Sequence, residues 1–448
     1  MRSKILVSVA LGVTTLAAAA ACSGAASSSQ NVTVNWWTWD PNQAAAYEQC
    51  IPAFEKANPG ITVKVSQYNV SDYFTKLTAG FVAGDAPDAF MDSVTYLQSY
   101  ASQGQLLPLD SYIKQDNIDM NQYSIGTAAW KYTDGKQYAL PMDWATAAIY
   151  YNEADLQAAG YTAKDVANLT WNADNGGTFE QMVKHLTVDK NGVRGDQPGF
   201  DRNNIATYGI GNLELASDAL GQSNWGALLE TAGIDIQNKP NWPTQFNYAN
   251  PELIKGVSRI RDLSNNGFSP QMNEFTTSES EQLGSGKAAM ALDGTWSATS
   301  YSQLPGIKIG TAPMVAGPNG KRALITNSNG NNIWAGGKNP GQTWKWVSYQ
   351  ESQACQTKAA TYNGSFLPSI KASTDALAQQ EQAKGVDFSV FADYVKNNEL
   401  FPTPDYNNGA KITDTLVPMI QSYFTNKSGD SIWTTLQQQS KTLLAAQQ

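Results

Sequence analysis

The sequence predicts an α/β protein with more than one domain. Residues 32–93 alternate runs of Val, Ile and Trp with stretches of helical periodicity, and this β-α-β-α-β order favours a parallel sheet with right-handed crossovers. The length of 448 residues allows two or three domains. The stretch 134–152, DGKQYALPMDWATAAIYYN, indicates a chain that leaves one domain and enters the next through an aromatic and acidic turn.

Residues 1–30 have the layout of a bacterial export signal. Two basic residues precede an apolar run over 5–21, which is too short and too rich in alanine to indicate a membrane span. The sequence AAAC at 19–22 resembles a lipobox, with Ala19 where that pattern usually has leucine. We expect a signal peptide over 1–21, a lipid on Cys22 and a flexible tether over 22–30. Secretion after cleavage at an Ala-x-Ala site is the alternative.

The charge of the chain argues against nucleic acid and against an anionic membrane surface as partners. The chain has 30 Lys and Arg against 39 Asp and Glu, and loss of the two basic residues of the signal leaves 28 against 39, a net charge of −11. Either partner would require basic patches. Charged residues are only 15% of the chain and aromatic residues 10%, a composition that suits a neutral, hydroxyl-rich ligand.

Polar and aromatic side chains follow the first three predicted strands. We expect strands over 32–36, 61–65 and 88–91, with helices beginning at Gln43 and Tyr73 between them. In a parallel α/β sheet, ligands bind beyond the carboxyl ends of the strands. The candidate ligand-binding residues there are Trp39, Asp40, Tyr68, Asn69, Asp92 and Ser93.

The crossover stretch is expected to form the floor of a carbohydrate-binding cleft. Predicted strands over 138–141 and 147–151 flank Asp143 and Trp144, an acceptor beside a flat apolar ring. A sugar ring covers an indole with its C–H face and donates its hydroxyls to carboxylates, so this pair offers both kinds of contact. A β-hairpin with a buried tryptophan is the alternative.

The second half of the chain adds weaker candidates. Residues 189–201, DKNGVRGDQPGFD, suggest a calcium loop but depart from the EF-hand pattern and lack its closing Glu, so we expect an ordered polar loop. The capping-box spacings at 178–181 and 278–281 each predict a helix start. Trp225 could line a cleft or pack in a core. Asn327 and Asn329 lie in an amide-rich segment expected near the cleft.

Six blocks, in order along the chain, resemble the extracellular solute-binding proteins of ABC importers for oligosaccharides, the family of maltose-binding protein. They are FEKANPGITVKV, KLTAGFVAGDAPDAFM, YASQGQLLPLDSYI, DGKQYALPMDWATAAIYYN, GSGKAAMALDGTW and NGSFLPS. The resemblance covers nearly all of the mature chain. It implies a two-lobed periplasmic-binding-protein-like fold, each lobe a mostly parallel sheet flanked by helices. It also implies that Trp296 stacks on sugar and that a membrane permease recognises the closed form.

The resemblance also implies where the lobes begin and end. Lobe one would comprise 31–143 with 322–370, lobe two 144–317 with 371–448, and 318–321 would be a hinge crossing. An even pair of cysteines in an exported chain favours a disulfide over two buried thiols, and both Cys50 and Cys355 fall in lobe one. We expect a monomer without cofactor or metal, held at the outer face of the cell membrane through Cys22.

Two other classes of function stay open on the sequence alone. No nucleophile elbow, zinc motif or C-x-x-C is present, but paired carboxylates such as Asp143 and Asp293 would serve an exported glycoside hydrolase. A cell-surface adhesin that recognises glycans in place is the third class. It would bind polymer surfaces without binding short free oligosaccharides tightly.

Overall fold

The computed structural model describes residues 31–446 except 214–217, 240–241, 276, 384–387 and 407. The expected export signal over 1–21 and the tether with Cys22 lie outside the described residues. No helix of the described part is long and apolar enough to cross a membrane.

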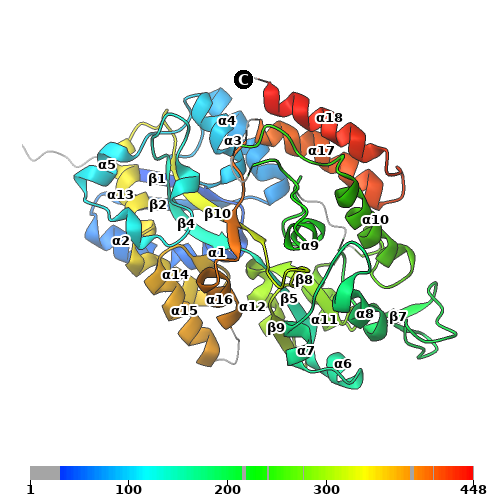
Figure 1. Cartoon of the computed structure of the whole chain (residues 1–448). Helices are drawn as coiled ribbons and strands as arrows, with labels where there is room; N and C mark the ends of the chain where they lie inside the picture. The colour runs from blue at the N-terminus through cyan, green and yellow to red at the C-terminus, as the bar shows by residue number, and fades with distance from the viewer. Residues whose placement is uncertain are drawn as a thin grey trace, which may run out of the picture.

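A large mixed sheet forms the centre of the first lobe (Figure 1). Its order is β11-β4-β10-β3-β1-β2, with β12 paired to β10 at one end. As predicted, β1 runs parallel to both β2 and β3, while β10 is antiparallel to β3 and β4. The strands are β1 (Val32–Thr38), β2 (Ile61–Gln67), β3 (Ala89–Ser93), β4 (Ala139–Ala145), β10 (Leu324–Ile333), β11 (Leu367–Pro368) and β12 (Leu400–Pro402).

Helices cover this sheet, and their ends follow local sequence. Asp40 caps the first helix, and Gly84 ends the third in the left-handed conformation (φ 74°) that suits glycine. The helical segments of this lobe are α1 (Pro41–Glu48), α2 (Ile51–Ala57), α3 (Val70–Ala83), α4 (Val94–Ser102), α5 (Asp110–Gln115), η1 (Met120–Gln122), η2 (Ala128–Trp130), α13 (Pro340–Gln350) and α14 (Gln353–Asn363).

A smaller sheet of order β8-β5-β9 forms the second lobe. Both of its strand pairs are antiparallel, so the parallel arrangement expected for this lobe is wrong in detail. The elements are β5 (Ala147–Asn152), α6 (Glu153–Ala158), α7 (Ala163–Ala167), α8 (Gly177–Leu186), β6 (Val188–Asp189), β7 (Ile205–Thr207), α9 (Trp225–Thr231), α10 (Pro251–Asn265), α11 (Glu279–Gly284), β8 (Met290–Gly294), η3 (Thr295–Ser297), α12 (Ala298–Ser302) and β9 (Ile309–Ala312).

The chain leaves the large sheet within the stretch 134–152, two residues after the expected boundary at 143/144. Only Thr146 separates β4 from β5, yet β4 pairs with β10 and β11 whereas β5 pairs with β8 and β9. The two strands do not pair with each other, so the hairpin in the alternative is wrong, whereas its buried tryptophan is confirmed, since Trp144 is only 3% exposed. The Thr146 hydroxyl donates to the Ile325 carbonyl (3.1 Å), which ties this crossing to the start of β10.

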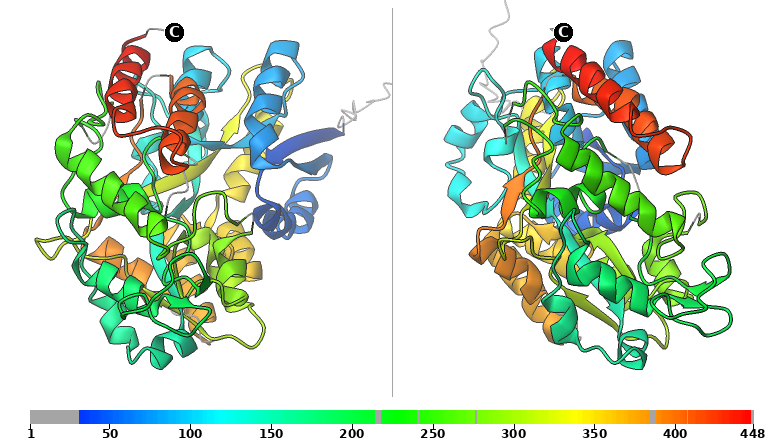
Figure 2. Two further views of the ribbon diagram at one scale, coloured as in Figure 1. Left: turned by 90° about the vertical axis from the view of Figure 1, so that its right-hand side faces the viewer. Right: turned by 45° about the vertical axis from the view of Figure 1, so that its right-hand side comes forward.

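The carboxyl-terminal segment returns to the second lobe later than expected. Helix α15 (Lys371–Ala383) packs on α14 and β11, which differs from the expected assignment of residues after 370 to lobe two. After α16 (Ser389–Lys396) and β12, α17 (Gly409–Phe424) packs on α18 (Ile432–Ala445) and also on α4 of the first lobe. Figure 2 shows α17 and α18 beside α10 and next to the helices of the first lobe.

Cys50 and Cys355 form the expected disulfide, with their Cα atoms 5.6 Å apart. Cys50 precedes α2, and Cys355 lies in α14, which packs on α1. Both cysteines are buried. The bond therefore joins two parts of the first lobe that are 305 residues apart in the chain.

Three local predictions had different outcomes. Ser278 and Glu281 form a capping box at the start of α11, as predicted. No capping box forms at 178–181, because the helix already begins at Gly177 with Gly176 as its N-cap, so Thr178 lies inside the helix, where its hydroxyl accepts the Thr170 N–H (2.9 Å). In the loop 189–201, the Asp189 carboxylate accepts backbone N–H groups, and the described residues contain no cluster of metal ligands.

Candidate functional site

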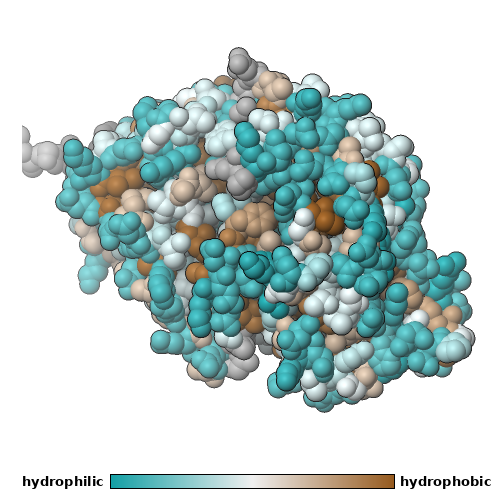
Figure 3. Space-filling view, in the orientation of Figure 1, coloured by the Kyte–Doolittle hydropathy of each residue, from teal (hydrophilic) through white to brown (hydrophobic). Residues whose placement is uncertain are grey.

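A cavity of about 770 Å³ lies between the lobes. The large sheet contributes residues from the ends of β1, β3 and β4 and from β10, and the second lobe contributes the segments after β8 and before α9. The face seen in Figure 3 is mainly hydrophilic, with hydrophobic residues in small separate areas. Because several lining residues come from the ends of β1, β3 and β4, the cavity lies at the ends of strands, where an α/β sheet commonly binds its ligands.

Most of the predicted ligand-binding residues line this cavity. They are Trp39, Asp40, Ser93, Asp143, Trp144, Trp296, Asn327 and Asn329. Their contact with a ligand stays a prediction.

Four predicted residues do not line the cavity. Trp225 is fully buried and packs against Phe424 and Trp433, so it belongs to the core of the second lobe. Asp92 is also fully buried, and burial raises the pKa of its carboxyl well above its ordinary value. Tyr68 packs edge-on against Trp37, and Asn69 is exposed in front of α3. Position at the end of a strand was therefore not enough to predict which residues line the cavity.

Asp143 lines the cavity and is only 2% exposed. Its carboxylate accepts hydrogen bonds from the Gln43 side-chain amide, from the Asn329 backbone N–H (3.1 Å) and from Asn329 Nδ2 (3.2 Å). Burial raises its pKa to about 6, although these hydrogen bonds act in the opposite direction. Asp143 is therefore a carboxylate held by neutral donors.

Asp40 caps α1 at the rim of the same cavity. Its Oδ1 accepts the backbone N–H groups of Asn42 (2.7 Å) and Gln43 (3.0 Å). Burial raises the pKa of Asp40, and its charge contributes to the raised pKa of Asp143. The two carboxylates therefore lie close enough to interact electrostatically.

Several buried polar atoms that border the cavity have no hydrogen-bond partner within the described chain. They are Gln43 Oε1, Gln222 Nε2, Thr295 Oγ1, Asn327 Oδ1 and Ser365 Oγ. A buried polar group without a partner costs about 1–3 kcal/mol. Five such atoms around one cavity leave hydrogen-bonding capacity that a bound ligand or water takes up.

Aromatic rings form part of both walls. In the first lobe Phe74 stacks on Tyr96 with ring centres 3.9 Å apart, and Trp39 lies against Phe74 at 5.3 Å. In the second lobe Trp296 is 40% exposed, and its ring lies so close over Gly294 that a Cβ there would be 2.3 Å from it. These surfaces offer flat apolar faces of the kind that sugar C–H groups cover.

Asp293, the other carboxylate considered for hydrolysis, does not line the cavity with Asp143. It is buried and accepts hydrogen bonds from the Tyr301 hydroxyl (3.0 Å) and the Gly294 N–H (2.7 Å). Burial raises its pKa. An acid and a base that act on one glycosidic bond must flank the same space, so this pair does not fit a hydrolase.

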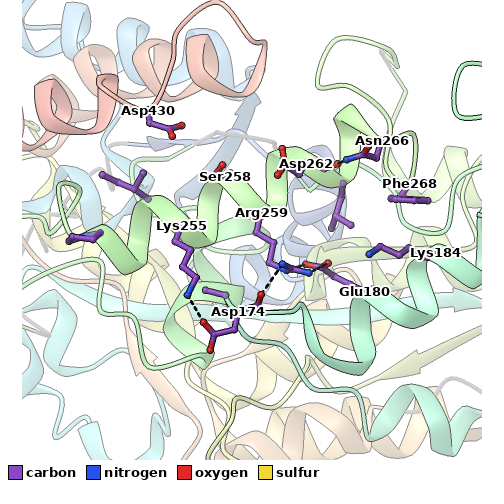
Figure 4. A pocket seen from close by; sticks show the side chains of 14 residues that line it. Asp174, Glu180, Lys184, Lys255, Ser258, Arg259, Asp262, Asn266, Phe268 and Asp430 are labelled. Carbon is purple, nitrogen blue, oxygen red and sulfur yellow. Dashed lines mark hydrogen bonds and ion pairs between the residues drawn. The ribbon is translucent and has the colours of Figure 1, made fainter. Parts of the chain in front are cut away.

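A second cavity, of about 680 Å³, lies between α8 and α10 on the second lobe (Figure 4). Its prominent charges are already paired within the chain: Arg259 with Glu180, and Lys255 with Asp174. The charged side chains here already have partners, whereas several polar atoms around the cavity between the lobes have no hydrogen-bond partner in the described chain. The cavity between the lobes is therefore the better candidate for a binding site.

The sequence reasoning missed several lining residues, among them Gln43, Thr295, Ser365 and Tyr406. Gln43 is in the first turn of the helix after β1, and Thr295 immediately precedes the predicted Trp296. Both positions could have been inferred from their neighbours. Tyr406 follows β12, and no local pattern marked this segment as part of the site.

The raised carboxyl pKa values predict how stability depends on pH. Burial raises the pKa of Asp143 to about 6 and those of Glu230 and Glu279 to about 7. The folded state then binds protons more readily than the unfolded state, so stability falls as pH rises from the ordinary values through these raised ones. We expect a melting temperature roughly 2–5 °C higher near pH 5 than near pH 7.5, measured by calorimetry. A melting temperature that increases steadily over this range would contradict the assignment.

Comparison with known proteins gives one family match and many structural matches. A family model described as bacterial extracellular solute-binding protein matches residues 38–356. A Brucella abortus binding protein is 24% identical over 326 residues, 72% of this chain and 72% of that protein. The maltodextrin-binding protein MdxE of Bacillus subtilis is 26% identical over 317 residues, 67% of this chain and 65% of that protein.

Two solved structures illustrate the shared fold. UspC of M. tuberculosis is 24% identical with a TM-score of 0.71, and the match covers 92% of this chain and 100% of that chain. The substrate-binding protein Lmo0181 of Listeria monocytogenes, solved with cycloalternan, is 19% identical with a TM-score of 0.76 and covers 93% of this chain and 100% of that chain. The two-lobed α/β fold is therefore confirmed.

Proposed function

Because this chain belongs to the family of bacterial extracellular solute-binding proteins, we propose that it captures an oligosaccharide between its lobes and delivers it to an ABC-type membrane permease. The family is one of proteins that bind solutes outside the cytoplasm and is not a family of enzymes. Relatives named for maltodextrin and lactose, and the Lmo0181 structure with cycloalternan, support a sugar as the solute.

The observation that carries the proposal is the set of unpartnered polar atoms around the cavity. Amide and hydroxyl groups of Gln43, Thr295 and Asn327 border it from both lobes. A hydroxyl both donates and accepts, so a saccharide satisfies amide oxygens, hydroxyls and carboxylates at once. Trp39 and Trp296 supply flat apolar faces on opposite walls of the same cavity.

Capture by closing lobes follows from the placement of these groups. Asp143 and Asn329 belong to the first lobe and Trp296 to the second, so a ligand gains its full contacts only when both lobes meet it. Such a ligand shifts the population toward the closed state by its differential affinity for the two states. The proposed hinge lies at the crossings, Thr146 and 318–321.

The anchor and the oligomeric state are part of the proposal. A lipid on Cys22, with 22–30 as a tether, would keep the binding protein beside its permease on the outer face of the membrane. A monomer suits this role because each chain contains both walls of its own cavity. Neither nucleic acid nor a cofactor has a part in it.

A calorimetric screen tests the proposed function. We expect one class among xylo-, galacto-, manno-, malto- and raffinose-type oligosaccharides to bind with a micromolar or lower dissociation constant. New reducing ends after prolonged incubation would instead support a hydrolase. Binding to insoluble polymers without binding of short oligosaccharides would support an adhesin.

Asp143→Ala should weaken the binding of the sugar that the screen identifies by about tenfold, because a charged acceptor contributes about 1.5 kcal/mol or more. The substitution also leaves the Gln43 amide and Asn329 without their shared acceptor. Thermal melting of the same variant therefore accompanies the calorimetric titration. Unchanged affinity in a folded variant would place Asp143 outside the binding site.

A further inference from the structure

The cavity between the lobes is acidic. Among the residues that the structure describes, its lining contains the carboxylates of Asp40, Asp143 and Asp218 and no Lys, Arg or His side chain. Asp40 and Asp143 belong to the first lobe, whereas Asp218 precedes α9 in the second lobe. A ligand held between the lobes therefore meets carboxylates on both sides.

Neutral groups alone stabilise these three carboxylates. Asp40 accepts backbone N–H groups of α1, and Asp143 accepts from amides of Gln43 and Asn329. Asp218 accepts the backbone N–H groups of Leu220 (2.6 Å) and Gly221 (2.7 Å). None of the three takes part in an ion pair with any residue that the structure describes.

Buried polar atoms without a partner in the described chain border the same acidic space. Gln43, Thr295 and Ser365 are at most 4% exposed, and each has a side-chain oxygen at the cavity without a partner in the described chain. All three oxygens can accept hydrogen bonds. Gln222 Nε2 adds one unpaired donor and the two hydroxyls can also donate, but the three carboxylates only accept, so the wall presents more acceptors than donors to a ligand.

We propose that the cavity selects a saccharide that carries a protonated amine over the same saccharide with a hydroxyl group at that position. This inference rests on the proposed function and specifies the substrate class of the same site. An ammonium group brings three donors and a positive charge into a space with several acceptors and no basic side chain in its described lining. Away from bulk water, its attraction to Asp40 and Asp143 is screened only weakly. The same charges disfavour acidic sugars.

The titratable surroundings of Asp143 bear on the pH at which an amine would bind. Asp40 faces it from the cap of α1, and Tyr47 of α1 and the buried Glu351 interact with it electrostatically from behind. All of these neighbours are acidic groups or phenols. They favour protonation of Asp143 at low pH, so the preference for an amine should decline below about pH 6.

The test compares two β1,4-linked disaccharides that differ only at C2 of their two rings. Cellobiose carries a hydroxyl at each of these positions, and the glucosamine disaccharide carries an amine at each. Calorimetric titration of the mature protein near pH 7 is expected to give roughly tenfold or higher affinity for the amine, as a charge-assisted hydrogen bond in place of a neutral one implies. N,N′-diacetylchitobiose, in which the amine is neutralised, should lose this gain.

Asp40→Asn is the matched variant, because Asn caps a helix as well as Asp does and only the charge is lost. It should lower affinity for the glucosamine disaccharide by at least threefold more than for cellobiose. Asp119→Asn is the control, since Asp119 also caps a helical turn, accepts the Asn121 N–H (3.0 Å) and does not line the cavity. This control should leave both affinities unchanged.

Each remaining outcome overturns the inference. If cellobiose binds as tightly as the glucosamine disaccharide or more tightly, the preference for an amine is wrong while the proposed function stands. If the amine is preferred but Asp40→Asn affects both sugars equally, the preference does not come from this charge and the inference fails. If no saccharide binds, the inference and the proposed function both fail.

Discussion

Removing the Cys50–Cys355 disulfide with a Cys50→Ala and Cys355→Ala double substitution is expected to lower the free energy of unfolding by about 3–5 kcal/mol. The bond closes a loop across a sequence separation of 305 residues, for which the chain-entropy model gives somewhat more than 5 kcal/mol. Measured effects are commonly smaller than this model predicts. Alanine is the suitable replacement because both cysteines are buried, and a serine hydroxyl there would be buried too.

Chemical denaturation of the mature protein and of the double variant measures the loss. The midpoint should move to lower denaturant concentration, and sugar affinity should stay close to that of the wild type because neither cysteine lines the cavity. Mass analysis after alkylation without reduction provides the control: the wild type should carry no modification at these two positions. Equal stability of the two proteins would mean that the disulfide adds nothing to the first lobe.

Trp296→Ala is expected to weaken binding of the cognate sugar by about thirtyfold or more, corresponding to about 2 kcal/mol for the truncation of an aromatic anchor. Trp296 lines the cavity and is 40% exposed, so its ring is free to be covered by a ligand. Sugar binding should shift the tryptophan emission of the wild type, because the indole passes from a partly wet to a covered environment. The variant should show a smaller shift.

Trp334→Ala is the matched control for loss of a tryptophan outside the cavity. Trp334 is half-buried just after β10, donates its indole N–H to Gln105 Oε1 (3.3 Å) and does not line the cavity. It should lower the melting temperature and leave the sugar affinity unchanged. If Trp296→Ala instead lowers only the melting temperature, Trp296 is a structural residue and the aromatic part of the proposed site is wrong.

The sequence by itself determined the features that depend on local pattern. Alternating strand and helix periodicity fixed the parallel arrangement of β1, β2 and β3, and the stretch around Asp143 marked the crossing between the lobes. The ordered family blocks implied the two-lobed fold and the disulfide between Cys50 and Cys355. These features depend on residues close together in the sequence or on a resemblance that spans the chain, so they can be predicted without knowledge of the tertiary contacts.

Tertiary structure alone decided which side chains share the cavity. Gln43, Asp143 and Asn329 meet through hydrogen bonds across 100 and 186 residues of sequence. Trp225 and Trp296 both stand near element ends, but only packing against Phe424 and Trp433 buries the first. Periodicity reports how a residue lies on its own helix or strand. Which faces then meet, and which polar atoms stay without a partner, depends on pairings between strands and helices that are distant in the chain.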